Sequence, residues 1–193
     1  IKNSDEVISI SEFLKNELRN QTGINSKVKY CKINKKRFHK GIKGARIIKK
    51  YHLKKGPVLL YVGRISPHKG IHLLIKAFNL VLKKIPNAKL LIVGKPTFNS
   101  YSKKLKKLAN RSVIFTGFVK DEELPYYYAA CDVYTTATLW EGFDLPAVEA
   151  QAIGKKVVAF DICSHPEVVK NGILIKSKDI NAFAKAIINS LNP

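Results

Sequence analysis

Short apolar runs alternate with longer amphipathic runs along the chain from Pro57 onward. The short runs predict buried strands at residues 58–62, 89–93, 113–116, 133–136, 157–160 and 173–175. The longer runs predict helices at residues 71–84, 100–109, 121–130, 145–152, 165–170 and 179–190. This rhythm is typical of a parallel sheet covered on both faces. We therefore expect an α/β fold with a doubly wound, Rossmann-like parallel sheet that binds ligands at the carboxyl ends of its strands.

The first 56 residues follow a different pattern. Strands are predicted at residues 7–10 and 27–31, and Ser11 is expected to cap a helix that runs to about Arg19. Residues 32–56 are rich in lysine and predict only a short helix near residues 45–51.

Two glutamates, Glu141 and Glu149, stand eight positions apart around a Gly142-Phe143 turn and the start of a helix. The turn and the proline at the start of the helix separate Glu141 from the helix that carries Glu149. A loop that holds Glu141 and a helix that holds Glu149 can aim both carboxylates into one crevice. Each carboxylate accepts several hydrogen bonds, which suits the hydroxyl pairs of a sugar or a ribose. The alternative is that the helix glutamate is a solvated surface group, as most glutamates are.

A glycine-containing basic loop, residues 63–70, joins the first predicted strand of the sheet to the first long helix. Gly63 permits a sharp turn close to a ligand, and the free N–H groups of the following helix are expected to attract an anion. Arg64 can fork onto phosphate oxygens, and Lys69 can add a point charge. The alternative is an ordinary basic loop, but its place at a strand's carboxyl end favours phosphate binding. The loop lacks the G-x-G-x-x-G pattern of dinucleotide sites.

These segments resemble the retaining glycosyltransferases of family 4, which have the two-domain GT-B architecture. The glutamate pair matches the family's E-x7-E arrangement, and the basic loop matches its G-R-x-x-x-x-K-G motif. The block from Gly117 to Val133, the stretch from Asp5 to Leu14 and the loop from Cys163 to Val169 also have counterparts, in the same order. The sequence departs from the family at Asp144, where Gly is common, and at Gly94-Lys95-Pro96, which replaces G-x-G-P.

The resemblance implies a role for each site residue. Arg64 and Lys69 would stabilise the donor diphosphate, and Glu141 would hold the hydroxyls of the donor sugar; these three form the predicted catalytic set. Glu149 would hold the ribose, and the backbone near Phe118 and Val119 would lie beside the base. From composition alone, the tyrosines of the same block favour packing. The remaining predicted donor-binding residues are Gly63, Gly142, Phe143, Asp144 and Leu145. His68 and His165 are expected to be incidental loop histidines; the alternative is that each contacts the ligand.

The resemblance also implies a domain organisation and an activity. Residues 1–32 would be a remnant of an N-terminal, acceptor-side domain, residues 33–56 a basic linker, and residues 57–193 the domain that binds a nucleotide sugar. The whole enzyme would transfer the sugar, with retention, to a saccharide or lipid-linked acceptor. This chain alone, without the rest of the N-terminal domain, would bind the donor but not transfer the sugar. The alternatives are another GT-B enzyme, such as an epimerase or a phosphorylase, and a basic nucleic-acid-binding α/β module without catalysis.

The net charge of +21 fits a polyanionic partner such as nucleic acid, an anionic membrane or a lipid-phosphate acceptor. The simpler interpretation is lysine spread over solvated faces, because no interleaving of basic and aromatic residues predicts base stacking. No specific nucleic-acid partner is therefore expected. The three scattered cysteines and five histidines show no metal-ligand spacing, so no metal and no cofactor are expected. The cysteine usage favours the cytoplasm, and the charge is compatible with a peripheral place at a membrane.

Overall fold

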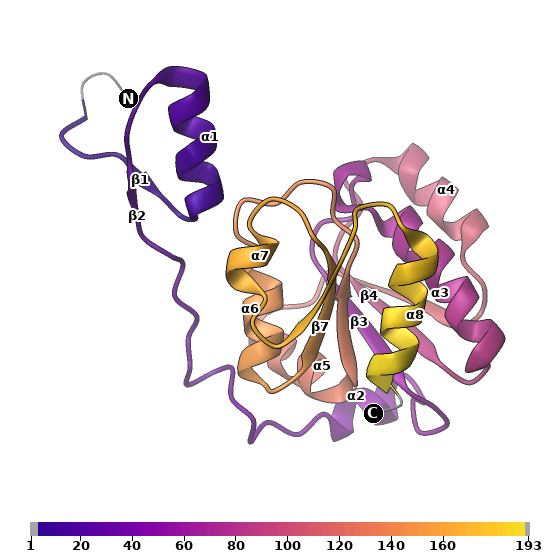
Figure 1. Cartoon of the computed structure of the whole chain (residues 1–193). Helices are drawn as coiled ribbons and strands as arrows, with labels where there is room; N and C mark the ends of the chain where they lie inside the picture. The colour runs from indigo at the N-terminus through magenta and orange to yellow at the C-terminus, as the bar shows by residue number, and fades with distance from the viewer. Residues whose placement is uncertain (1–3, 192–193) are drawn as a thin grey trace.

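The computed structural model describes residues 4–191, and its centre is a six-stranded parallel sheet (Figure 1). The strands lie in the order β5-β4-β3-β6-β7-β8. Their bounds are β3 Val58–Val62, β4 Lys89–Val93, β5 Val113–Gly117, β6 Val133–Thr136, β7 Lys156–Phe160 and β8 Gly172–Ile175. All six predicted strands are therefore present, and the predicted doubly wound α/β fold is confirmed.

Helices cover both faces of the sheet (Figure 1). One face packs against α3 Ile71–Lys84, α4 Asn99–Leu108 and α8 Ile180–Leu191. The other face packs against α2 Ala45–Lys50, α5 Leu124–Ala130 and α6 Leu145–Ala152. Strand β3 is buried at every position because its side chains enter these two cores alternately: Leu59 and Tyr61 on one side, Leu60 and Val62 on the other. Burial on both faces explains why the strands are continuous apolar runs.

The order of the strands places a crevice between β3 and β6. From β3 the chain builds outward through β4 to β5, then returns to the other side of β3 and builds outward through β6, β7 and β8. The connections that leave β3 and β6 therefore diverge to opposite sides, and a gap opens above the carboxyl ends of these two strands. Open α/β sheets bind their ligands at such a point.

Element boundaries differ from the sequence prediction at a few ends. The helix predicted at 121–130 is divided into a 3₁₀ turn, η2 Asp121–Glu123, and α5. Helix α7 His165–Val168 stops two residues before its predicted end, because the N–H groups of Lys170 and Asn171 donate instead to Gln151 Oε1, at 2.7 and 2.8 Å. A long-range side-chain contact of this kind has no local sequence signal.

The N-terminal segment forms a small unit beside the main sheet (Figure 1). Strands β1 Ile8–Ser9 and β2 Lys27–Val28 pair in parallel, and α1 Glu12–Thr22 connects them. Ser11 caps α1 as predicted, since its Oγ accepts from Leu14 N at 3.1 Å. Both strands are shorter than predicted, because only two residue pairs of the ladder form. The domain boundaries at residues 32 and 56 stay predictions.

One carboxylate ties this small unit to the main domain. Glu167 in α7 accepts from Glu12 N and Phe13 N at the start of α1, at 2.8 and 2.9 Å, and from Tyr30 Oη at 3.0 Å. A negative charge at a helix N-terminus is favourable because the first N–H groups of the helix lack internal partners. Within residues 4–191, no helix is long and apolar enough to cross a membrane.

Candidate functional site

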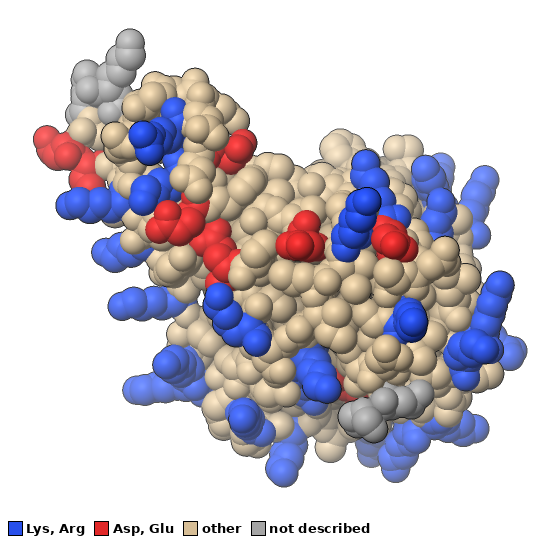
Figure 2. All heavy atoms as spheres, in the orientation of Figure 1, with Lys and Arg blue, Asp and Glu red and all other residues tan. Residues whose placement is uncertain are grey.

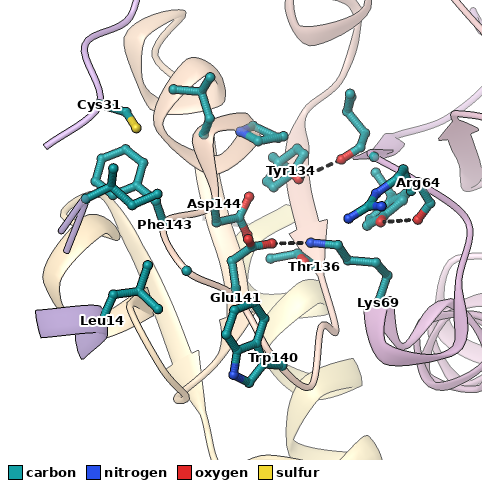
Figure 3. A pocket seen from close by; sticks show the side chains of 17 residues that line it. Leu14, Cys31, Arg64, Lys69, Tyr134, Thr136, Trp140, Glu141, Phe143 and Asp144 are labelled. Atoms are coloured by element: carbon teal, nitrogen blue, oxygen red, sulfur yellow. Dashed lines mark hydrogen bonds and ion pairs between the residues drawn. The ribbon is translucent and has the colours of Figure 1, made fainter. Parts of the chain in front are cut away.

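A cavity of about 430 Å³ lies at the crevice between β3 and β6 (Figure 3). Its walls come from the end of β3, the 3₁₀ turn η1 Pro67–Lys69, the end of β6 and the loop before α6. Eight predicted site residues line it: Gly63, Arg64, Lys69, Glu141, Gly142, Phe143, Asp144 and Leu145. The small N-terminal unit closes one side with Ile10 and Leu14, and Cys31 follows it.

Close approach of the backbone shapes the floor of the crevice. A Cβ atom on Gly94 would lie 1.9 Å from the carbonyl oxygen of Gly63, so the loops after β3 and β4 fit together only with glycine there. The Arg64 carbonyl is held by Tyr61 Oη at 3.1 Å. The Arg64 guanidinium itself is exposed and forms no ion pair with any described residue. It is therefore free to meet an incoming anion.

Lys69 and Glu141 form an ion pair across the cavity (Figure 3). Their side chains are only 15% and 18% exposed, so the pair is largely desolvated. Lys69 comes from η1 and Glu141 from the loop after β6, and the two loops are held together by a Leu139 N–H that donates to His68 O at 2.7 Å. An anion that enters between Arg64 and Lys69 would compete with Glu141 for the ammonium group.

The helix N-terminus expected to attract an anion is occupied by internal bonds. The N–H of His72 donates to Tyr101 Oη at 3.2 Å, and the N–H groups of Leu73 and Leu74 donate to Gly70 O. Gly70 turns the chain from η1 into α3 with a φ of 64°. An anion at this crevice would therefore meet the side chains of Arg64 and Lys69 rather than the start of α3.

A second cavity, of about 410 Å³, adjoins the first through Val62, Gly63 and Arg64. Phe118, Val119 and Lys95 contribute to its wall. The Phe118 ring is 63% exposed, and Lys95 Nζ lies 4.9 Å from its centroid. A largely apolar cavity with an exposed ring at its edge suits a flat aromatic group such as a nucleotide base. The sequence analysis included Phe118 and Val119 but missed Lys95.

Glu149 lies apart from both cavities. It is on α6, and its Oε2 accepts from Tyr128 Oη at 2.7 Å. Burial raises the pKa of the Glu149 carboxyl, while the Tyr128 hydrogen bond and the charge of Arg37 oppose that shift. Glu149 is thus an oriented, partly buried carboxylate rather than a solvated surface group.

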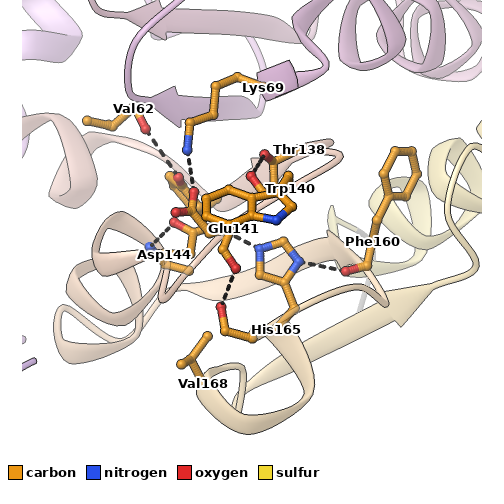
Figure 4. Close-up of polar contacts among 12 residues, drawn as sticks. Val62, Lys69, Thr138, Trp140, Glu141, Asp144, Phe160, His165 and Val168 are labelled. Atoms are coloured by element: carbon orange, nitrogen blue, oxygen red, sulfur yellow. Dashed lines mark hydrogen bonds and ion pairs between the residues drawn. The ribbon is translucent and has the colours of Figure 1, made fainter. Parts of the chain in front are cut away.

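His165 is not a loop histidine but part of the core behind the site (Figure 4). Its side chain is fully buried, and Nε2 lies 2.9 Å from Asp144 Oδ2. His68, in contrast, is exposed in η1, and its Nδ1 lies 3.2 Å from Ser66 Oγ. The expectation of two incidental histidines is therefore wrong for His165, which contacts the predicted donor loop.

Several further residues line the first cavity that the sequence analysis did not assign to it: Tyr61, Tyr134, Thr136, Trp140, Leu14 and Cys31. Tyr61, Tyr134 and Thr136 occupy strand positions whose apolar or β-branched character gives no signal beyond strand formation. Their place near the carboxyl ends of β3 and β6 is the one clue, and it depends on knowing the strand order. Trp140, 52% exposed, stands at the mouth.

On the face that Figure 2 shows, the charged side chains do not mark a separate site. Figure 2 shows Lys and Arg side chains distributed around the edges of the molecule in this view, not gathered in one patch. No group of three His, Cys, Asp or Glu side chains in the part of the chain that the structure describes could hold a metal ion. The chemistry at the crevice is thus that of two cations and a loop carboxylate beside an apolar cavity.

Comparison with known proteins agrees with this geometry. The sequence model of the family described as glycosyl transferases group 1 matches residues 44–192, which include both cavities' main-domain walls. The chain belongs to the group 1 glycosyltransferases. The family relationship confirms the expected resemblance.

Curated relatives of this group 1 glycosyltransferase chain include transferases named for O-antigen and for lipopolysaccharide. The chain is 32% identical to O-antigen chain mannosyltransferase B of Escherichia coli over 152 residues, covering 75% of this chain and 39% of the relative. It is 34% identical to the lipopolysaccharide 1,2-N-acetylglucosaminetransferase of Salmonella typhimurium over 145 residues, covering 70% and 38%. The chain thus spans about two-fifths of the length of the relatives it matches.

Solved structures show the same fold. Alr3699/HepE of Anabaena, in complex with UDP and glucose, superposes with a TM-score of 0.89 at 26% identity, covering 96% of this chain and 53% of that one. The C-terminal domain of LpcC, a group 1 glycosyl transferase of Francisella tularensis, superposes with a TM-score of 0.68 at 26% identity, covering 84% and 89%. The whole main domain, and not only the crevice, therefore has the architecture of GT-B glycosyltransferases.

Proposed function

We propose that this chain forms the donor side of a retaining glycosyltransferase and binds a nucleotide diphosphate sugar. The observation that carries the proposal is the meeting of two adjoining cavities at Arg64, one apolar and one holding the Lys69–Glu141 pair. The apolar cavity suits a base, and the cavity that holds the ion pair suits a diphosphate and a sugar. HepE, which is 26% identical to this chain, is described in complex with UDP and glucose. A second HepE structure, in complex with UDP-glucose, superposes on this chain with a TM-score of 0.88 at 25% identity.

The two cations provide the chemistry of this proposal. Negative charge grows on the diphosphate as the bond from its oxygen to the anomeric carbon breaks, and fixed positive groups stabilise that charge. The bond from the anomeric carbon to the acceptor oxygen forms on the same face of the sugar, and the acceptor's proton passes to the leaving diphosphate. Arg64 and Lys69 do the work that a divalent metal does elsewhere, so we propose metal-independent transfer.

In this proposal, Glu141 and Glu149 accept hydrogen bonds from different hydroxyl groups of the donor. Glu141 is drawn away from Lys69 when the diphosphate binds, and its carboxylate then accepts from the sugar hydroxyls. Glu149 already uses one oxygen for Tyr128, and its other oxygen is proposed to accept from the ribose. The negative charge of Asp121, which lines the second cavity, is among the groups that raise the pKa of Glu149.

In this proposal, the acceptor is bound by the whole protein, of which this chain forms the donor side. We propose a saccharide or lipid-linked acceptor, because the relatives include an O-antigen mannosyltransferase and a lipopolysaccharide N-acetylglucosaminetransferase. The segment with α1 and β2 contributes Ile10, Leu14 and Cys31 to one side of the cavity. We therefore propose that an acceptor-binding domain forms the opposite wall of this crevice. The high positive charge fits a peripheral place beside anionic lipid.

Donor binding can be measured through Trp140, the one tryptophan of the chain, which stands at the mouth of the cavity. We expect UDP, GDP or ADP to change its fluorescence, and the corresponding sugar nucleotide, UDP-glucose, GDP-mannose or ADP-glucose, to bind as well. Binding should persist in EDTA. A duplex DNA of random sequence serves as the comparison. Binding of the DNA without binding of any nucleotide, or an absolute need for Mg²⁺ or Mn²⁺, would contradict the proposal.

The two glutamates are expected to respond differently to substitution. Glu141→Gln should weaken the sugar nucleotide and leave the nucleoside diphosphate nearly unchanged, because only the sugar hydroxyls lose a charged acceptor. Glu149→Gln should weaken both ligands by about 1.5–3 kcal/mol, the scale of a charged hydrogen bond. Isothermal titration of each variant with both ligands measures the division. Equal losses for the two ligands in both variants would mean that the assignment is wrong.

A further inference from the structure

Asp144 occupies a backbone conformation that favours glycine. Its φ is 59° and its ψ 64°, in the left-handed region, and its side chain is buried. A residue with a Cβ atom costs about 1–2 kcal/mol there relative to glycine. Asp is one of the few residues that adopt this conformation. Here, both oxygens of its side chain have polar partners. The contacts of the carboxylate must offset the conformational cost.

The two oxygens of the Asp144 carboxylate have separate partners (Figure 4). Oδ1 accepts from Ala147 N at 3.2 Å and so caps α6. Oδ2 lies 2.9 Å from Nε2 of His165, whose other ring nitrogen, Nδ1, lies 2.6 Å from the carbonyl oxygen of Phe160. A carbonyl oxygen only accepts, so Nδ1 must carry a hydrogen. The contact between Nε2 and Oδ2 then needs a proton of its own.

The proton state of this pair follows from the geometry. With the shared proton, an imidazolium donates to a carboxylate at Nε2 and to a carbonyl at Nδ1. Without it, a nitrogen lone pair faces a carboxylate oxygen in the protein interior, and that contact becomes repulsive. Burial lowers the pKa of His165, but the hydrogen bond and charge of Asp144 outweigh it and raise the pKa above its ordinary value. The favourable contribution is therefore complete below the ordinary histidine pKa of about 6.5 and is lost as pH rises through the higher folded value.

Other charged and titratable groups face the pair from each surrounding element. Glu141 lies on the loop before α6 and raises the pKa of His165, while Lys69 in η1 pairs with Glu141. The charge of Asp144 contributes to the raised pKa of three tyrosines, Tyr61 in β3, Tyr128 in α5 and Tyr134 in β6. Burial raises the pKa of all three well above the ordinary tyrosine value, so they stay neutral across the range in which His165 titrates.

The turn that contains His165 holds the donor loop at both of its ends. At the start of the loop, Ser164 Oγ donates to the carbonyl oxygen of Glu141 at 3.1 Å. At its end, His165 contacts Asp144, which follows Glu141 by three residues. Glu141, Gly142, Phe143 and Asp144 line the cavity between these two points. The contact of His165 with Asp144 is thus one of two polar contacts that join the ends of this loop to α7 and the residue before it.

We propose that Asp144 and His165 are positioning residues whose shared proton holds the loop 141–144 in the geometry that binds the donor, so that donor binding weakens in alkali. The inference rests on the proposed donor site. It also accounts for Asp at a position whose backbone conformation favours glycine: the side chain that strains the backbone is the one that anchors the loop to α7 and to the end of β7.

Asp144→Asn is the sharpest test. The amide can accept from Ala147 N through its oxygen and donate to the lone pair of a neutral His165 Nε2 through its nitrogen, so no shared proton is needed. His165→Gln is a second variant, since its amide can donate to Asp144 but does not titrate. His39→Gln, an exposed histidine in the basic segment before α2, is the matched control.

The measurement is the affinity for UDP-glucose and GDP-mannose from pH 6 to pH 10 in wild type and variants. Above the transition, wild type and His39→Gln should lose up to tenfold in affinity per pH unit, as loss of one required proton dictates. Asp144→Asn and His165→Gln should lack this fall. Because all four proteins meet the same ligand, its own titration cancels in the comparison. A wild type that binds with a flat profile, or variants that keep the wild-type fall, would overturn the inference.

A second measurement separates this inference from the proposed function. In the ligand-free protein, the ¹⁵N signals of the His165 ring and the amide exchange of residues 142–145 and of Ala147 should change with one common midpoint above pH 6.5, after correction for the intrinsic pH dependence of exchange. Exchange that is unaffected by the titration of His165 would overturn the inference. Absence of binding of any nucleotide to wild type would instead overturn the proposed donor site, and the common midpoint would still be measured.

Discussion

Alanine at Arg64 or Lys69 is expected to weaken the binding of a nucleoside diphosphate by about 1.5–3 kcal/mol for each position, the scale of a hydrogen bond to a charged group. This corresponds to roughly a 10- to 150-fold loss in affinity. Lys69→Ala should have the larger effect, because it also leaves Glu141 without its ion-pair partner beside the incoming diphosphate. Calorimetric titration with the preferred diphosphate measures both variants.

Lys107→Ala is the matched control for charge. Lys107 is an exposed lysine of α4 that lines neither cavity, so its removal lowers the net charge by the same amount without changing the site. Its affinity should equal that of wild type at physiological salt, where charges beyond about 8 Å are screened. A loss in Lys107→Ala as large as in Lys69→Ala would show that overall charge, and not the pair of site cations, attracts the ligand.

Alanine at Gly70 is expected to be among the most damaging single changes to the site. A Cβ atom there would lie 1.8 Å from the carbonyl oxygen of Ala137, and the backbone φ is 64°. The left-handed conformation and the forced separation of two backbone segments together cost about 2–5 kcal/mol in the free energy of unfolding. The separation also moves η1 away from the loop after β6, so Lys69 and Glu141 should lose their contact. Denaturant unfolding and diphosphate titration test these two effects.

Gly23→Ala separates steric collision from backbone strain. Gly23 ends α1 with a φ of 73°, close to that of Gly70, but a Cβ atom there meets nothing within 4 Å. Only the conformational cost of about 1–2 kcal/mol should appear in the unfolding free energy, and the affinity for the diphosphate should be unchanged. Equal destabilisation by the two substitutions would mean that the contact between Gly70 and Ala137 relaxes freely.

Much of the fold could be predicted because the local pattern and the tertiary structure agree in the main domain. Strands buried on both faces must be continuous apolar runs, and the helices between them must show one apolar stripe. The ends of β3, β4 and β6 and of α3 and α6 are therefore as predicted. The predictions were poorer in the small N-terminal unit, where the strands β1 and β2 pair over only two residues and little burial constrains their length.

The sequence by itself determined the fold class, the order of the elements and eight of the residues that line the first cavity, because strand ends and the Glu141 and Arg64 motifs are local patterns. Only the tertiary structure decided which of these residues meet. The contact of His165 with Asp144, the ring of Phe118 beside Lys95, and the bond of Glu149 to Tyr128 join segments that lie 21 to 23 residues apart. Such contacts depend on strand order and on which face each side chain occupies. Those are properties of the packed sheet, and no local periodicity encodes them.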